Sequence, residues 1–252
     1  EPTALLNTAA KAHQLFGSPS VSLQEMTEMN AHWVMDGGEE IDKQTHFQER
    51  KGAFKMLNEA VKKHLHEGTV IPAHPLALTA DRKLDEVRQR ALTRYYIDAG
   101  VGGIAVGVHT TQFEIRRPDI NLFKPVLTLA MEELERAKVP SSFIKVGGIS
   151  GPTDQALQEA KFMKEIGYDL GLLSMGGLQG ESEAALLERT RVVAEVIPVF
   201  GFYLQPAVGG RVLSYDFWRE LANIPNVYAI KIAPFNRYQS IDVVRAVCHS
   251  ER

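Results

Sequence analysis

Cysteine is almost absent from this sequence, because Cys248 is the only one in 252 residues. This excludes a disulfide framework and a zinc site built from cysteines, and a reducing cytoplasm is the simplest compartment. Long apolar runs are also missing, and each falls well short of the about 18 residues that a membrane span needs. The polar, helix-like N-terminus shows no leader pattern. We therefore expect a chain that neither enters a membrane nor carries a secretory signal.

An excess of charge of one sign is missing as well. The chain has 28 Lys and Arg against 31 Asp and Glu, a net charge of -3, so nothing favours nucleic acid or an anionic membrane as a partner. No glycine-rich nucleotide motif of the G-x-G-x-x-G or Walker type follows an apolar run. With 44% hydrophobic and 23% charged residues, the chain can still bury a full core.

The first part of the chain, residues 1–67, has only helical patterns. Helices are predicted over residues 3–16, from Ser22 to the Gly37-Gly38 pair, and over residues 46–66. Ser22 and Glu25 have the spacing of a capping box. We expect these residues to form an N-terminal helical extension.

After residue 68 short apolar runs alternate with amphipathic helices, the pattern of repeated βα units around a parallel sheet. Strands are predicted at residues 69–73, 102–108, 142–146, 169–174, 197–203 and 227–232. Helices are predicted at residues 84–99, 123–137, 154–166, 181–195, 215–222 and 241–247.

Alternation within the strands favours a (β/α)8 TIM barrel over a doubly wound open sheet. Several strands have one bulky face, suited to packing under helices, and one small or polar face, suited to a barrel interior. On this pattern Tyr203 and Lys231 share the inward face at the C-terminal ends of consecutive strands, where barrel active sites lie. Residues 68–252 supply six units of the eight, so we expect a barrel truncated after the sixth.

Lys231 stands in the apolar run Val-Tyr-Ala-Ile-Lys-Ile-Ala that begins at Val227. A charged amine in such surroundings is costly unless it is paired, so the lysine is expected to be largely neutral. A neutral lysine amine is the nucleophile that forms Schiff bases with carbonyl compounds.

Several segments resemble the dihydrodipicolinate synthase / N-acetylneuraminate lyase family over about residues 68–247. The run around Lys231 is similar to the motif that carries the Schiff-base lysine, and Tyr203-Leu-Gln-Pro206 is similar to a Tyr-x-x-Pro motif whose tyrosine relays protons. Residues 107–114 resemble a Gly-Thr-Thr-Gly-Glu loop that binds the substrate carboxylate, with His109 and Gln112 as departures. Further departures are Ser174-Met-Gly-Gly177, where the lysine-biosynthesis members carry tyrosines and a proline, and the Ala207–Gly210 segment.

The resemblance implies a cytoplasmic Schiff-base lyase or aldolase that acts on a pyruvate-like 2-oxo acid, needs no cofactor or metal, and forms a homo-oligomer (a dimer or a tetramer). The catalytic residues that it implies are Lys231, Tyr203 and Thr111. The substrate-binding residues that it implies are Thr110 and Gly148, and we expect His109 and His74, which stand at strand ends and depart from the family pattern, to join them. The second substrate is expected to differ from that of dihydrodipicolinate synthase.

Two other function classes stay open at this point. His74 and His109 at strand ends suggest a metal-dependent aldolase or isomerase, although no third ligand is comparably placed. A non-catalytic relative that binds a small ligand is the other class. Each candidate also has a structural interpretation: Lys231 as one half of a buried ion pair, Tyr203 as a core tyrosine, and Thr110-Thr111 as a turn.

Overall fold

The computed structural model describes residues 21–36 and 56–251. The chain divides into two compact units, residues 1–52 and 53–252. In the first unit the structure describes helix α2, Leu23–Met35. The predicted capping box is confirmed, because the Ser22 hydroxyl accepts from the Glu25 amide and the Glu25 carboxylate accepts from the Ser22 amide. The predicted helix over residues 3–16 lies outside the described residues.

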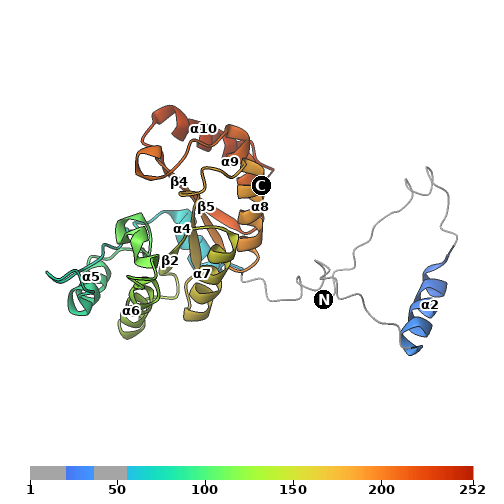
Figure 1. The fold of residues 1–252 in the computed structure, drawn as a ribbon, viewed down its shortest axis with the longest axis horizontal. Helices are drawn as coiled ribbons and strands as arrows, with labels where there is room; N and C mark the ends of the chain where they lie inside the picture. The colour runs from blue at the N-terminus through green and yellow to red at the C-terminus, as the bar shows by residue number, and fades with distance from the viewer. Residues whose placement is uncertain (1–20, 37–55, 252) are drawn as a thin grey trace. The chain divides into compact units, whose positions relative to one another are not determined.

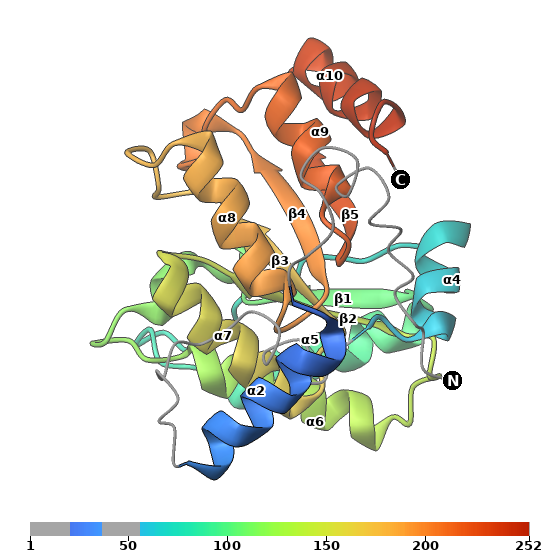
Figure 2. The same ribbon diagram turned by 90° about the vertical axis from the view of Figure 1, so that its right-hand side faces the viewer.

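The second unit, drawn in Figure 1, is built on a parallel sheet in which the strands follow one another in chain order, as their labels in Figure 2 show. The strands are β1 Gly103–Val106, β2 Ile144–Ile149, β3 Leu170–Ser174, β4 Val199–Leu204 and β5 Val227–Ala233. The helices are α4 Glu59–Glu67, α5 Glu86–Asp98, α6 Phe123–Arg136, α7 Thr153–Ile166, α8 Glu183–Ala194, α9 Tyr215–Asn223 and α10 Arg237–Cys248. These elements confirm the predicted alternation of strands and helices.

Two apolar layers pack against the two faces of this sheet. The outer face lies under helices α6 to α9, and residues such as Leu127 and Met163 fill that layer. The inner face packs on Leu57 and Val61, which lie at the start of α4 and within it. Helix α4, which the sequence interpretation grouped with the N-terminal extension, lies beside β1 and β2 in the second unit (Figure 2).

The predicted first strand is shorter than expected, and the predicted third helix is not helical at residues 56–58. Over residues 69–73 the only ladder pairing that the structure records is a bridge from Ala73 to Ala105. Pro72 and Pro75 lack the amide hydrogens that a longer ladder needs. The described part of the third helix begins at Glu59, because the Asn58 side chain caps it by accepting from the Ala60 amide. Residues 46–55 lie outside the description.

The sheet is open over the described residues, with β1 and β5 at the two ends of the strand order. Next to β1, the bridge between Ala73 and Ala105 extends the sheet by one short pairing. On the β5 side a groove of about 550 Å³ separates β5 from α10, and its lining includes Tyr228, Ile230 and Val244. The α/β fold with a parallel sheet is therefore present, whereas closure into an eight-stranded barrel stays a prediction.

Candidate active site

Lys231 lies near the C-terminal end of β5 and points to the inner face of the sheet. Its partner across the parallel ladder is Phe202, and its Nζ atom lies 4.9 Å from the centre of the Phe202 ring. The side chain is half-buried, and burial holds the pKa of the amine below its ordinary 10.5. Among the residues that the structure describes, no carboxylate pairs with it. Burial therefore makes the neutral, nucleophilic form of this amine easier to reach than on an exposed lysine.

Tyr203 lies on the opposite face, so the prediction that it shares the inward face with Lys231 is wrong. Its ladder partner is Ile232, and its buried ring packs on Trp218 of α9 with the ring centres 4.7 Å apart. Its hydroxyl oxygen accepts from the Leu213 amide at 3.5 Å. Burial raises the pKa of this phenol. The geometry gives Tyr203 a place in the outer apolar layer, and the structure does not bring it to the amine.

A register shift between β4 and β5 causes this difference. Val199 pairs with Val227, but Phe200 pairs with Ala229, so Tyr228 is an extra residue on β5. An unbroken register from Val199 would have paired Tyr203 with Lys231. Because side chains alternate with a period of two, one inserted residue turns every later side chain to the other face. Strand alternation read from the sequence contains no sign of this insertion.

Thr111 is fully buried, and its hydrogen-bonding groups are already in use. Its hydroxyl donates to the His74 carbonyl at 2.6 Å and accepts from the Gly107 amide at 3.0 Å. Its own amide donates to the Val108 carbonyl. Thr111 therefore has no free hydrogen-bond donor for a substrate, which its predicted catalytic role would need. The residue joins the loop after β1 to the segment that ends in His74.

Two neighbouring residues of the same loop are open to solvent. His109 and Thr110 lie in the short 3-10 helix His109–Thr111, and both are exposed. The His109 ring packs edge-on against Phe113, with the ring centres 5.8 Å apart. They follow β1, whereas Lys231 is on β5 at the other end of the strand order. Their role in binding a carboxylate remains a proposal.

Gly148, in β2, lies against the backbone at the start of the loop after β1. A Cβ atom at this position would lie 2.2 Å from the Gly107 carbonyl oxygen, which is far inside a normal contact. Arg116 donates to the Gly148 carbonyl at 2.9 Å and pairs with Glu159 of α7. Glycine is needed at this position for close packing. Substrate binding by Gly148 stays a prediction.

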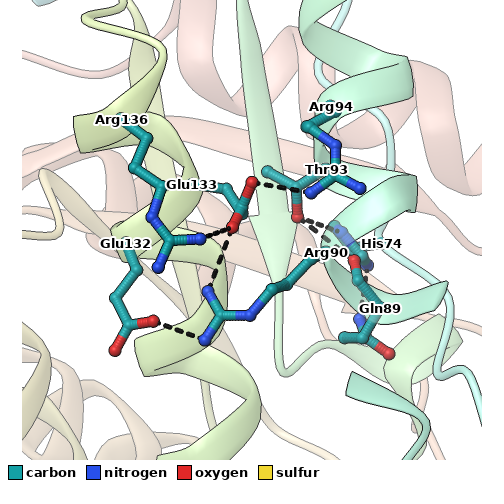
Figure 3. Close-up of polar contacts among 8 residues, drawn as sticks. All are labelled: His74, Gln89, Arg90, Thr93, Arg94, Glu132, Glu133 and Arg136. Atoms are coloured by element: carbon teal, nitrogen blue, oxygen red, sulfur yellow. Dashed lines mark hydrogen bonds and ion pairs between the residues drawn. The ribbon is translucent and has the colours of Figure 1, made fainter. Parts of the chain in front are cut away.

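His74 is buried beneath helix α5, with both ring nitrogens engaged, which argues against its predicted role in substrate binding. Its Nε2 atom contacts the Thr93 hydroxyl at 2.9 Å, and its Nδ1 atom contacts the Gln89 amide at 2.9 Å (Figure 3). Because these contacts occupy both ring nitrogens, His74 is not free to bind a metal ion together with His109. Among the described residues no group of three or more His, Cys, Asp or Glu side chains is placed to hold a metal ion.

Burial lowers the pKa of His74 below its ordinary 6.5, which predicts a pH-dependent stability. The unfolded chain takes up a proton at higher pH than the folded chain does. The free energy of unfolding should therefore fall as the pH decreases from about 6.5 toward the folded-state pKa. Denaturant titrations at pH 7.5 and 5 measure this fall, and His74→Gln should reduce it. An equal fall in the variant would contradict the prediction.

Ser174 is the residue at the inner face that the sequence analysis noted only as a departure from the family pattern. It ends β3, is buried, and pairs across the ladder with Phe202, the same residue that pairs with Lys231. The alternation of Leu170, Leu172 and Ser174 was a usable signal, because it puts a hydroxyl at the C-terminal end of an inward-facing row.

The fold and the half-buried amine define an α/β protein with a lysine at the C-terminal edge of a parallel sheet. No protein-family model and no curated protein sequence matches the chain. Solved structures with the same fold include a dihydrodipicolinate synthase from Acinetobacter baumannii complexed with pyruvate, at 20% identity and a TM-score of 0.63, covering 71% of this chain and 60% of its own.

Two further structures have the same fold. One is a prophage protein of the dihydrodipicolinic acid synthase family from E. coli K12, in complex with pyruvate, at 22% identity and a TM-score of 0.62; the match covers 70% of this chain and 58% of that one. The other is an N-acetylneuraminate lyase from Mycoplasma synoviae, at 19% identity and a TM-score of 0.58, with the same coverage. The resemblance drawn from the motifs is thus confirmed at the level of the fold, and the chain spans about 60% of these structures.

Proposed function

We propose that this chain is a Schiff-base-forming lyase or aldolase that acts on pyruvate-like 2-oxo acids through Lys231. The observation that carries the proposal is the state of this amine: it is half-buried at the C-terminal end of an inner strand face, has a lowered pKa, and packs on an aromatic ring. An amine of this kind can attack a keto carbon. Two structures of the same fold hold pyruvate, which supports the substrate class.

The chemistry follows from the iminium that such an attack produces. The positively charged nitrogen withdraws electrons, so a neighbouring C–H or C–C bond can release its electron pair and form an enamine. The exposed His109 and Thr110 are the predicted residues that remain available for a substrate carboxylate. The second substrate is proposed to differ from that of dihydrodipicolinate synthase, because Ser174–Gly177 replaces the tyrosines and proline of those members.

Reduction with borohydride in the presence of a 2-oxo acid tests this function. Pyruvate and longer 2-oxo acids should each be tried, followed by peptide mapping by mass spectrometry. We expect a covalent adduct on Lys231 and on no other lysine, with no effect of a chelator. Activity that a chelator abolishes, without any adduct, would favour a metal-dependent aldolase or isomerase instead.

We also propose that the chain forms a homo-oligomer and works in the cytoplasm. An apolar surface supports self-association: Ile232, Val244 and Val247, which line the groove between β5 and α10, are exposed. The single cysteine suits a reducing compartment. Over the described residues no helix is long and apolar enough to cross a membrane. Sedimentation equilibrium and the localisation of a tagged chain test these two proposals.

A further inference from the structure

The inner face of the sheet carries one row of side chains that runs across three strands at the level of Lys231. Ser174 on β3 pairs with Phe202 on β4, and Phe202 pairs with Lys231 on β5. Partners in a parallel ladder point to the same face, so the hydroxyl and the amine stand on either side of the Phe202 ring. The row contains no other polar side chain.

The spacing of this row suits a small carbonyl compound. The Cα atoms of Ser174 and Lys231 are two strand spacings apart, about 10 Å. The lysine Nζ atom lies over the Phe202 ring and so leans toward β3. The ring forms an apolar floor between the two polar groups. A keto group above this floor would meet the amine from one side and the hydroxyl from the other.

The bonding of Ser174 leaves its proton available. Its Oγ atom accepts from the Gly176 amide at 3.1 Å, which fixes the orientation of the oxygen. Over the described part of the chain no acceptor is recorded for the hydroxyl proton. The hydroxyl of Tyr203, in contrast, lies across the sheet with its oxygen near the Leu213 amide. Ser174 is thus the hydroxyl that shares a face and a row with the amine.

We propose that Ser174 is a catalytic residue that transfers protons between nitrogen and oxygen while the Schiff base forms on Lys231; this rests on the proposed function. The amine nitrogen bonds to the keto carbon, and the π electrons of the carbonyl move to its oxygen. Ser174 gives its proton to that oxygen and takes one from the nitrogen, so the serine is unchanged. A second proton from solvent releases the oxygen as water, and the nitrogen lone pair completes the iminium.

The rate of adduct formation with pyruvate, followed by rapid mixing and borohydride quenching, tests this role. Ser174→Ala should slow the reaction by about 10²-fold or more, as expected for loss of a proton-transfer group. Ser174→Thr keeps a hydroxyl and should recover most of the rate. Thr190→Val, which removes a buried hydroxyl that donates to the Leu186 carbonyl, is the matched control for folding. Melting temperatures are measured for all variants.

If Ser174 had only a structural role, Ser174→Ala would lower the rate of adduct formation without changing how the remaining rate depends on pH. We expect Ser174→Ala to change that profile and to lose part of the solvent isotope effect. A normal rate in Ser174→Ala, with the adduct still on Lys231, would overturn this inference and leave the proposed function standing. A large loss of the rate of adduct formation in Tyr203→Phe, without such a loss in Ser174→Ala, would also overturn this inference. Absence of any adduct in the unmodified chain would overturn both.

Discussion

Replacing Glu133 by alanine should lower the free energy of unfolding by about 1.5–3 kcal/mol, because a buried carboxylate loses its charge-assisted hydrogen bonds while the arginines left behind are partly exposed to water. The Glu133 carboxylate is buried on α6, and its two oxygens accept from Arg90 and Arg94 of α5 and from Arg136 (Figure 3). Without it, Arg90 keeps only Glu132 as a recorded acidic partner. The loss should therefore weaken the contact between the two helices.

Glu132 is the matched control, since it is adjacent on the same helix and also pairs with Arg90, at 2.6 Å. Its side chain is 43% exposed, so Glu132→Ala should cost no more than about 1 kcal/mol. Denaturant unfolding of the two variants at pH 7 measures the difference. Equal losses would show that the Glu133 network acts as an ordinary surface ion pair.

The same network predicts an acid-sensitive contribution to stability. Burial raises the pKa of the Glu133 carboxyl, but hydrogen bonds from Arg94 and Arg90 and the charge of Arg136 outweigh this, so the pKa lies below its ordinary 4.5. The folded carboxylate thus resists protonation more than the unfolded one. Its contribution is complete above about pH 4.5 and is lost as the pH falls through the folded-state pKa. Glu133→Ala should lack this component.

Lys231→Arg should abolish adduct formation with 2-oxo acids, with a loss of at least about 10³-fold in rate. Arginine is long enough to keep the contact with Phe202, but its guanidinium stays protonated and cannot act as the nucleophile. The variant therefore separates the chemistry of the amine from its packing. Stopped-flow mixing with pyruvate followed by borohydride, with mass spectrometry of the intact chain, measures the result.

Lys138→Arg, on an exposed residue just after α6, serves as the control for the substitution itself. In the unmodified chain the rate should rise with pH until the amine is neutral, and the plateau should begin below pH 10.5 because burial lowers the pKa of Lys231. A normal rate of adduct formation in Lys231→Arg would assign the Schiff base to another lysine.

Strand and helix positions were largely predictable, because they depend on local periodicity. The apolar run at residues 169–174 became β3, and the amphipathic pattern at residues 123–137 became α6. The prediction was weakest where backbone chemistry interrupts the period, as at Pro72 and Pro75 in the first strand. Asn58 similarly caps α4 inside a pattern that reads as continuous helix.

The candidate site was only partly predictable. Lys231 could be chosen from its own surroundings, since an amine in an apolar run is unusual wherever the run folds. The sequence could not show that the polar groups of His74 and Thr111 are engaged, because their partners, Gln89 for His74 and the His74 carbonyl for Thr111, come from other segments. Whether a polar group is free or engaged depends on those distant partners.

Local sequence patterns are thus enough to predict the alternating α/β architecture, the length of most elements, and the identity of the unusual amine. Each follows from patterns that lie within a few turns of chain. Which hydroxyl faces that amine depends instead on how the strands pair in the folded chain. One extra residue on β5, Tyr228, turns Lys231 away from Tyr203 and into the row of Phe202 and Ser174. The physical reason is that pairing between strands sets the face of a side chain, and such pairing is a property of two segments together.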